Sequence, residues 1–169
     1  MSVVLAAAPD PSARHHLEKT VIDGVEIEDI KKYLSPDSLK KVRETGLKAR
    51  VWGLVKGRSN DIYWKRLGEN DVILFNVGNN YAVYSRVLDT DINNELAKHL
   101  WKPSSRTGSY YDRIIFLKDV RQTEIPISRI NHLLGYATNF KPSRNVSFVI
   151  VQKQRVEKGT SPVFHLRRR

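Results

Sequence analysis

The sequence of 169 residues contains no cysteine, which excludes a disulfide framework, a thiolate zinc site, an iron–sulfur site and a cysteine nucleophile. It also has no apolar run approaching the roughly 20 residues that a membrane helix needs. No GxxxxGKS/T phosphate loop, GxGxxG fingerprint or HExxH zinc motif occurs, which argues against an ATPase, a Rossmann enzyme and a zinc protease. With 40% apolar and 28% charged residues, the composition predicts a soluble, cytoplasmic globular protein.

Positive charge is concentrated in the last part of the chain. Residues 1–48 hold eight basic and eight acidic side chains, whereas residues 101–169 hold fourteen basic and four acidic ones. The formal net charge of the whole chain is +11. Such asymmetry indicates a polyanionic partner, and nucleic acid is the usual one because association releases phosphate counterions. An acidic partner protein is the alternative.

The first third of the chain predicts short helices after a disordered start. Residues 1–14 are small and proline-rich, so we expect a tail there. Residues 27–34 place three apolar side chains on one helical face. A second short helix is predicted with Ser35 as its N-cap, Pro36 at its first helical position and Gly46 at its end.

After residue 48 the pattern changes to short strands. Gly78-Asn79-Asn80 predicts a hairpin turn, Asp91 and Asn93 are candidate caps of one helix, and Ser128 is the candidate cap of another that Gly135 closes. The expected strands cover residues 50–55, 71–75, 81–88, 114–117, 146–151 and 163–166. This succession predicts an α+β domain built around a small barrel or a strongly curved sheet.

Candidate catalytic residues are few. Asp10, Asp29 and Lys31 fit the loose PD…(D/E)xK pattern of metal-dependent nucleases, but Asp10 falls in the expected tail and Lys31 in an expected helix. His15 and His16 have no third ligand nearby in the sequence. We therefore expect a binding domain rather than an enzyme, with no cofactor and no metal; a nuclease using those three residues is the competing hypothesis.

Aromatic residues at the ends of the expected elements alternate with cations, which is the composition that base-stacking proteins need. Trp52, in mid-strand, is expected in the core. Trp64 is the best candidate wall of a base pocket. The candidate base-pocket residues are Trp64, Tyr81, Asn79, Asn80, Ser59, Asn60 and Trp101. The candidate phosphate-binding residues are Lys56, Arg58, Lys65, Arg66, Arg106, Arg113, Lys141, Arg144, Lys153 and Arg155.

Residues from about 50 to 155 resemble the EVE domains of the PUA-like superfamily, which also includes the YTH readers of methylated adenine. The segments that carry the resemblance are 51–55, Trp64, 68–75, 81–87, 101–103 and 114–136. The last of these is most similar to the N-terminal DNA-recognition modules of McrB-type modification-dependent restriction systems. The resemblance implies a PUA-like barrel with an aromatic pocket for a modified, flipped base, Trp64 as its first wall and residues 79–81 near a second.

These observations predict a helical N-terminal extension over residues 1–48 and a PUA/EVE-like nucleic-acid-binding domain over residues 49–169. The expected function is recognition of a modified base in DNA as the targeting domain of a restriction system. A fused or associated motor and nuclease would then cut the DNA. A PUA-like RNA-binding protein acting on tRNA or rRNA is the alternative that the charge and the expected fold fit equally well.

Overall fold

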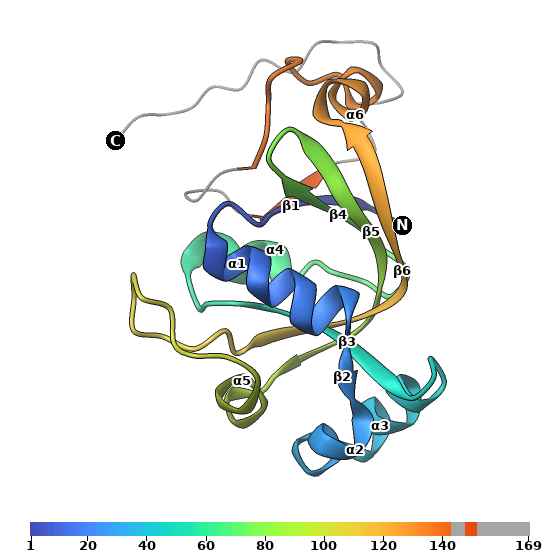
Figure 1. The fold of residues 1–169 in the computed structure, drawn as a ribbon, viewed down its shortest axis with the longest axis vertical. Helices are drawn as coiled ribbons and strands as arrows, with labels where there is room; N and C mark the ends of the chain where they lie inside the picture. The colour runs from blue at the N-terminus through green and yellow to red at the C-terminus, as the bar shows by residue number, and fades with distance from the viewer. Residues whose placement is uncertain (143–147, 152–169) are drawn as a thin grey trace.

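The computed structural model describes residues 1–142 and 148–151. Within these ranges the strands form one seven-stranded sheet with the order β2-β3-β6-β5-β4-β1-β7 (Figure 1). The strands are β1 (Val3–Ala7), β2 (Val25–Glu26), β3 (Lys48–Leu54), β4 (Val72–Val77), β5 (Asn80–Ile92), β6 (Arg113–Pro126) and β7 (Phe148–Val151). All described pairings are antiparallel except that of β1 with β4.

The expectation of a disordered start is wrong, because residues 3–7 form β1 inside the sheet. This strand pairs in parallel with β4 and antiparallel with β7, so both of its edges are hydrogen-bonded. Val4 and Leu5 are fully buried. The sequence around these two residues is a short run of small apolar side chains. Such a run fits a strand that is buried on both faces, as found here, but it also fits an unstructured tail.

Helices flank the sheet and follow the local capping signals. The segment α1 (Pro11–His16) begins after Asp10, whose side chain accepts from Ala13 N, and continues as the π-helix η1 (Leu17–Ile22). The two predicted short helices are present, but the prediction that Gly46 closes the second is wrong, because this helix ends at Arg43 with Glu44 as its C-cap. Together they consist of α2 (Ile27–Ile30), the 3-10 turn η2 (Lys31–Tyr33) and α3 (Pro36–Arg43), with Ser35 capping α3 as expected.

The remaining helices are α4 (Arg58–Trp64), α5 (Asn94–Leu100) and α6 (Ile127–Leu134). Asn93 caps α5 as predicted, whereas Asp91 lies inside β5. The predicted cap Ser128 is wrong, because the N-cap residue is Pro126 and no side chain caps α6 there. Gly135 ends α6 in the left-handed conformation, with φ of 68°.

The hairpin predicted at residues 78–80 joins β4 to β5, but the strands beyond it are longer than their apolar runs indicate. β5 extends to Ile92 and β6 to Pro126, with register shifts between them at three places. Such β-bulges increase local twist and let long strands bend around a core. The predicted strand over residues 146–151 is described only from Phe148 onward, and the one over residues 163–166 lies outside the described residues.

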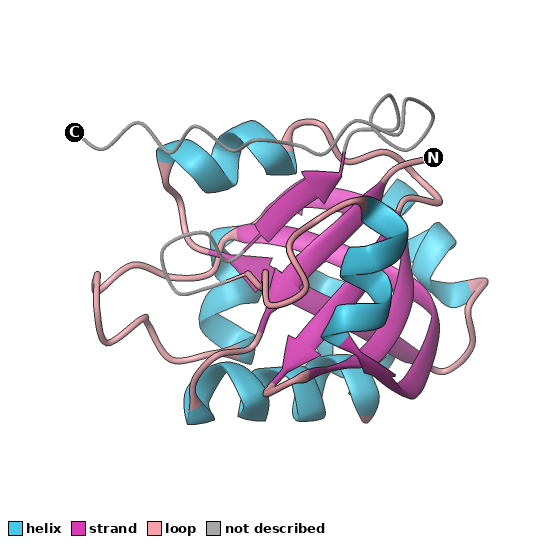
Figure 2. Cartoon of the chain, turned by 90° about the horizontal axis from the view of Figure 1, so that it is seen from above, coloured by secondary structure: helices cyan, strands magenta, loops and turns pink. Residues whose placement is uncertain are grey.

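The sheet curls around its core, and its two outer strands are β2 and β7 (Figure 2). One core cluster, which includes Trp52, Phe75 and Ile115, lies between the sheet and the α1–η1 segment. A second, which includes Trp101 and Phe116, lies under α2, α3 and α5. The predicted α+β class is confirmed; among the described residues the strongly curved sheet is open rather than closed into a barrel.

Residues on both sides of position 48 share this framework. β1 and β2 belong to the same sheet as the later strands, and η1 packs on β3. The division at residue 48 remains a prediction about domain organisation. Within the described parts of the chain, no helix combines the length and the apolar character needed to cross a membrane.

The burial of β1 predicts that its side chains are needed for stability. Replacing Leu5, which is fully buried, with alanine should lower the free energy of unfolding by about 2–5 kcal/mol. Leu47→Ala is the matched control, because Leu47 is 85% exposed, and should change the free energy by at most about 0.5 kcal/mol. Urea unfolding followed by circular dichroism measures both. Equal values for the two variants would show that β1 does not hold the sheet together.

Tyr81 should make the protein sensitive to alkali. Its ring is fully buried with Leu5 and Leu74, and its hydroxyl has no hydrogen-bond partner among the described residues. Burial raises the pKa of Tyr81 from 10.0 to about 12, and Tyr136 adds a smaller contribution. The unfolded chain therefore loses this proton first, and stability falls as pH rises from 10 to 12. Tyr81→Phe should flatten this fall, measured as the free energy of unfolding across that range. An identical pH dependence in both proteins would contradict the assignment.

Candidate nucleic-acid interface

A cleft of about 470 Å³ opens where the ends of β1 and β3 approach α4 and the segment between α5 and β6. Its walls come from parts of the chain that are far apart in sequence. The lining residues are Ala7, residues 9–13, residues 52–55, Asn60, residues 104–106 and Tyr111. The volume lies in the range of small-molecule pockets, which run from about 300 to 1,000 Å³.

Gly53 allows the cleft to form. A Cβ atom at this position would lie 2.6 Å from Trp101 Cζ3 and 2.6 Å from the Tyr111 carbonyl oxygen. No real side chain tolerates such distances, so only glycine lets these residues close on β3. The contact places Tyr111 in the cleft wall and buries Trp101 behind it.

Side chains from η1 and α4 occupy much of the outer edge of β3 beside the cleft. β2 covers this edge only at Lys48 and Ala49. Further along, the Val51 carbonyl accepts from Thr20 Oγ1 at 2.7 Å and the Val55 carbonyl accepts from Asn60 Nδ2 at 2.9 Å. Because backbone groups alternate in direction along a strand, Gly53 faces the same edge, between these two carbonyls.

Aromatic rings form the apolar part of the site. The Trp52 ring lies edge-to-face on Phe75, with 5.1 Å between centroids, and its indole nitrogen is buried without a described partner. The Tyr111 ring meets His16 edge-on at 5.1 Å. Burial, aided by the neighbouring His15, lowers the pKa of His16, and Asp10 opposes this shift. The neutral imidazole therefore supports Tyr111 by aromatic contact.

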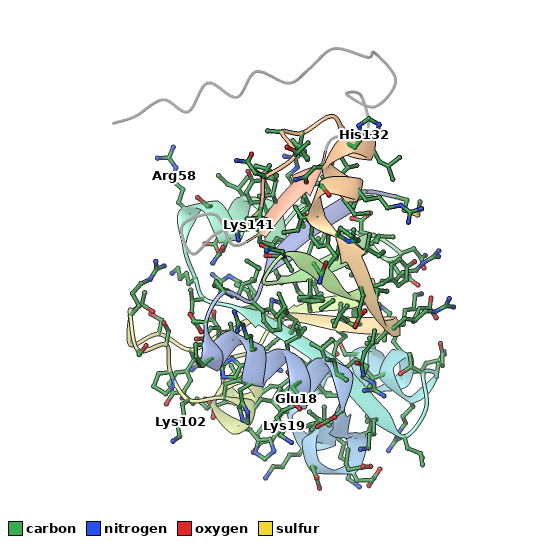
Figure 3. All side chains as sticks on the ribbon, turned by 45° about the horizontal axis from the view of Figure 1, so that its top comes forward. Glu18, Lys19, Arg58, Lys102, His132 and Lys141 are labelled. Carbon is green, nitrogen blue, oxygen red and sulfur yellow. The ribbon has the colours of Figure 1, made fainter. Side chains whose placement is uncertain are left out.

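Exposed cations surround this region. Arg106 lines the cleft, while Lys56 and Arg58 lie where β3 leads into α4. Lys102, at the start of the segment between α5 and β6, projects outward on the same side of the molecule as Arg58 (Figure 3). The predicted phosphate-binding residues Lys65, Arg66 and Lys141 are also exposed. Arg144, Lys153 and Arg155 lie outside the described residues.

Arg113 is the member of the predicted phosphate-binding set that is buried. It is 9% exposed and forms ion pairs with Asp61 at 2.8 Å and Asp112 at 3.2 Å. A guanidinium held in this way is not available to a phosphate in this conformation. Its position indicates a structural role, which is to tie α4 to the start of β6.

The predicted base-pocket residues do not gather at one place. Asn60 lines the cleft and Ser59 is exposed beside it on α4. Asn79 and Asn80 are exposed at the β4–β5 hairpin, where Asn80 borders a different cleft, between the hairpin and the α1–η1 segment.

The three aromatic candidates are engaged in packing. Tyr81 is fully buried and Trp101 is 5% exposed. Trp64 is half-buried against the first core cluster, and its Nε1 donates to the Ile114 carbonyl at 3.1 Å. A base pocket that uses these rings stays a prediction, and the cleft described above is centred on other side chains.

Sequence reasoning missed three cleft residues. Trp52 was assigned to the core, where it does pack, but it also lines the cleft. Tyr111 is absent from the predicted base-pocket residues, yet it lines the cleft. Asp10 was assigned to a tail and to a nuclease pattern, whereas it caps α1 at the cleft. The signal that could have found Tyr111 is its position two residues before the strand that begins at Arg113, at the end of a segment that carries Lys102 and Arg106.

The nuclease pattern is spread over separate elements. Asp10 precedes α1, in the middle of the molecule in Figure 1, and Asp29 lies in α2, at the bottom of the same view. Lys31 pairs with Glu28 at 2.5 Å. The described part of the chain holds no group of three or more His, Cys, Asp or Glu side chains arranged for a metal ion.

Comparison with known proteins identifies a solved structure with a similar fold. No family model matches the chain, and no curated protein matches it in sequence. Among solved structures, the chain is similar to the N-terminal domain of Thermococcus gammatolerans McrB bound to m5C DNA. The TM-score is 0.69 at 17% sequence identity, with 92% of each chain covered. The similarity to McrB N-terminal domains expected from the sequence is therefore confirmed at the level of the fold.

Proposed function

We propose that this chain is a DNA-binding module that takes a modified, flipped base into the cleft beside β3, as the targeting domain of a modification-dependent restriction system. The observation that supports the proposal most is that the Tyr111 ring, the polar side chains of Asp10 and Asn60 and the exposed cation Arg106 meet at one cleft. The solved structure with the same fold was determined with m5C DNA. The charge of +11 is of the sign that a DNA partner requires.

The cleft offers the two kinds of contact that a flipped base needs. Tyr111, which is half-buried, provides aromatic surface for the face of the base. Asn60, the Asp10 carboxylate and the backbone of Gly53 provide donors and acceptors for its edge. A carboxylate accepts hydrogen bonds from an exocyclic amine, which cytosine and adenine carry and thymine lacks.

The free energies are consistent with a modest preference for the modification itself. Extruding a paired base costs a few kcal/mol, and aromatic stacking returns roughly 1–3 kcal/mol. Burying one methyl group adds about 0.8 kcal/mol, which is about a fourfold preference. Phosphate contacts from the exposed cations supply sequence-independent affinity. Strong discrimination would therefore depend on the polar groups of the cleft.

In this proposal the chain binds and does not cut. The lining of the cleft contains one acidic residue, Asp10, and its side chain caps α1. Cleavage would be the work of a motor and a nuclease, fused to this domain or associated with it.

Loss of Tyr111 should weaken binding to modified DNA. We expect Tyr111→Ala to raise the Kd for a duplex with one 5-methylcytosine or N6-methyladenine by about tenfold, the loss of one stacked ring. Tyr110→Ala is the matched control, because Tyr110 is adjacent, partly buried and outside the cleft. Fluorescence anisotropy with modified and unmodified duplexes measures the effect. Tighter binding of an RNA hairpin than of any duplex would instead support the RNA-binding alternative.

The cations near the cleft should act alike on all DNA sequences. Arg58→Ala and Arg106→Ala should each weaken binding to modified and unmodified duplexes equally. Each should also reduce the slope of log K against log salt by about one. Arg43→Ala is the control, because Arg43 is exposed on α3 and pairs with Glu28. Anisotropy titrations over a range of salt concentrations give the slopes. An unchanged slope in both cleft variants would place the phosphates elsewhere.

A further inference from the structure

A second cleft, of about 850 Å³, lies between the β4–β5 hairpin and the α1–η1 segment. Residues 9–13 line the cleft beside β3, whereas Arg14 and four residues from Leu17 to Asp23 line this second one, here called the η1 groove. Residues 122–124 of β6 complete its lining together with the hairpin. The two clefts share no lining residue, so each can be occupied without the other.

The η1 groove is acidic although the chain as a whole carries a net charge of +11. Glu18, Asp23 and Glu124 line it, with Arg14 as its basic lining residue, and all four side chains are exposed. Asp23 pairs with Lys19 at 3.4 Å. Glu18 and Glu124 form no ion pair within the described parts of the chain. A surface of this sign attracts cationic groups and repels phosphates.

The groove borders a part of β6 that has one strand neighbour. β3 pairs with β6 from Arg113 to Leu117, whereas β5 pairs with it as far as Pro126. Among the described residues, no hydrogen bond other than those of the β5 ladder reaches the main chain of residues 120–125. Because backbone groups alternate in direction along a strand, part of this main chain faces away from β5 and is available to another extended segment. Two register shifts between β5 and β6 fall in this stretch, which limits a regular ladder to a few residues.

Apolar side chains lie between the acidic ones. Ile22 from η1 and Val77 and Ala82 from the hairpin line the groove and are partly exposed. A segment that adds to a strand edge gains affinity from main-chain hydrogen bonds and specificity from the side chains around them. The η1 groove supplies both kinds of contact, with negative charge to select the segment.

We propose that the η1 groove docks a cationic, extended segment of a partner protein, with its main chain alongside β6 and its basic side chains against Glu18 and Glu124. Nucleic acid does not fit this groove, because phosphates carry the charge that it repels. The inference does not depend on the function proposed for the cleft beside β3. A domain that binds DNA and does not cut it needs a second surface to hold its effector, and the η1 groove leaves the other cleft free.

The test uses the full chain and a fluorescein-labelled peptide of alternating lysine and valine. The same peptide with glutamate in place of lysine is the charge control, and a backbone N-methylated form removes main-chain donors. Glu18→Gln and Glu124→Gln remove the groove charges one at a time. Glu44→Gln is the matched control, because Glu44 is exposed at the end of α3, outside the groove. Anisotropy gives Kd, and amide chemical shifts of the isotope-labelled protein locate the peptide.

We expect the cationic peptide to bind and to shift the amide resonances of residues 122–124, while the acidic peptide does not bind. Glu18→Gln and Glu124→Gln should each raise Kd by about threefold, and together by about tenfold, as expected for exposed ion pairs. Glu44→Gln should match the unaltered protein. N-methylation should weaken binding at least as much as one charge removal, because it removes hydrogen bonds to β6.

Three results would overturn the inference. The first is no binding of the cationic peptide. The second is an equal loss in Glu44→Gln and in the two groove variants, which would show that overall charge, and not the groove, governs binding. The third is a set of chemical-shift changes confined to residues outside the groove. Equal binding of the N-methylated peptide would contradict the docking of its main chain along β6.

Discussion

The candidate site depends on one close contact, in which the segment after α5 packs directly against β3. Gly53 permits this contact because it has no side chain. With a Cβ at this position 2.6 Å from both the Trp101 ring and the Tyr111 carbonyl, the segment could not close. Trp101 would leave the second core cluster, and Tyr111 would leave the cleft wall. The loop that carries Arg106 is held between the same two aromatic residues, so the packing of the second core cluster and the shape of the candidate site depend on one contact.

The wall of the cleft that α4 forms is held mainly by polar contacts. α4 is short and has no buried residue of its own, so apolar burial does not hold it strongly. Polar contacts do so instead, through Asn60, Asp61 and the Trp64 indole. A helix fixed on one side by directional bonds keeps its other side in a defined orientation.

Local rules explain which predictions from the sequence were right. Ser35 and Asn93 cap helices through contacts within three residues, and the turn at residues 78–80 requires only its own backbone conformations. β1 was missed because its pairing with β4 joins Val3 to Val72, a contact that no local pattern reports. The aromatic candidates were ambiguous for the same reason. Tyr81 next to a turn and Tyr111 next to a strand have similar local contexts, yet one is fully buried and the other lines the cleft.

The sequence by itself determined the α+β class, the basic character of the molecule and the supply of aromatic and cationic side chains, because composition and short-range periodicity act within a few residues. The tertiary structure alone decided which of these side chains meet. It brought Asp10, Trp52, Asn60, Arg106 and Tyr111 to one cleft and placed Arg113 in a buried ion pair. Those choices depend on strand order, register and close packing, which arise from contacts between residues far apart along the chain.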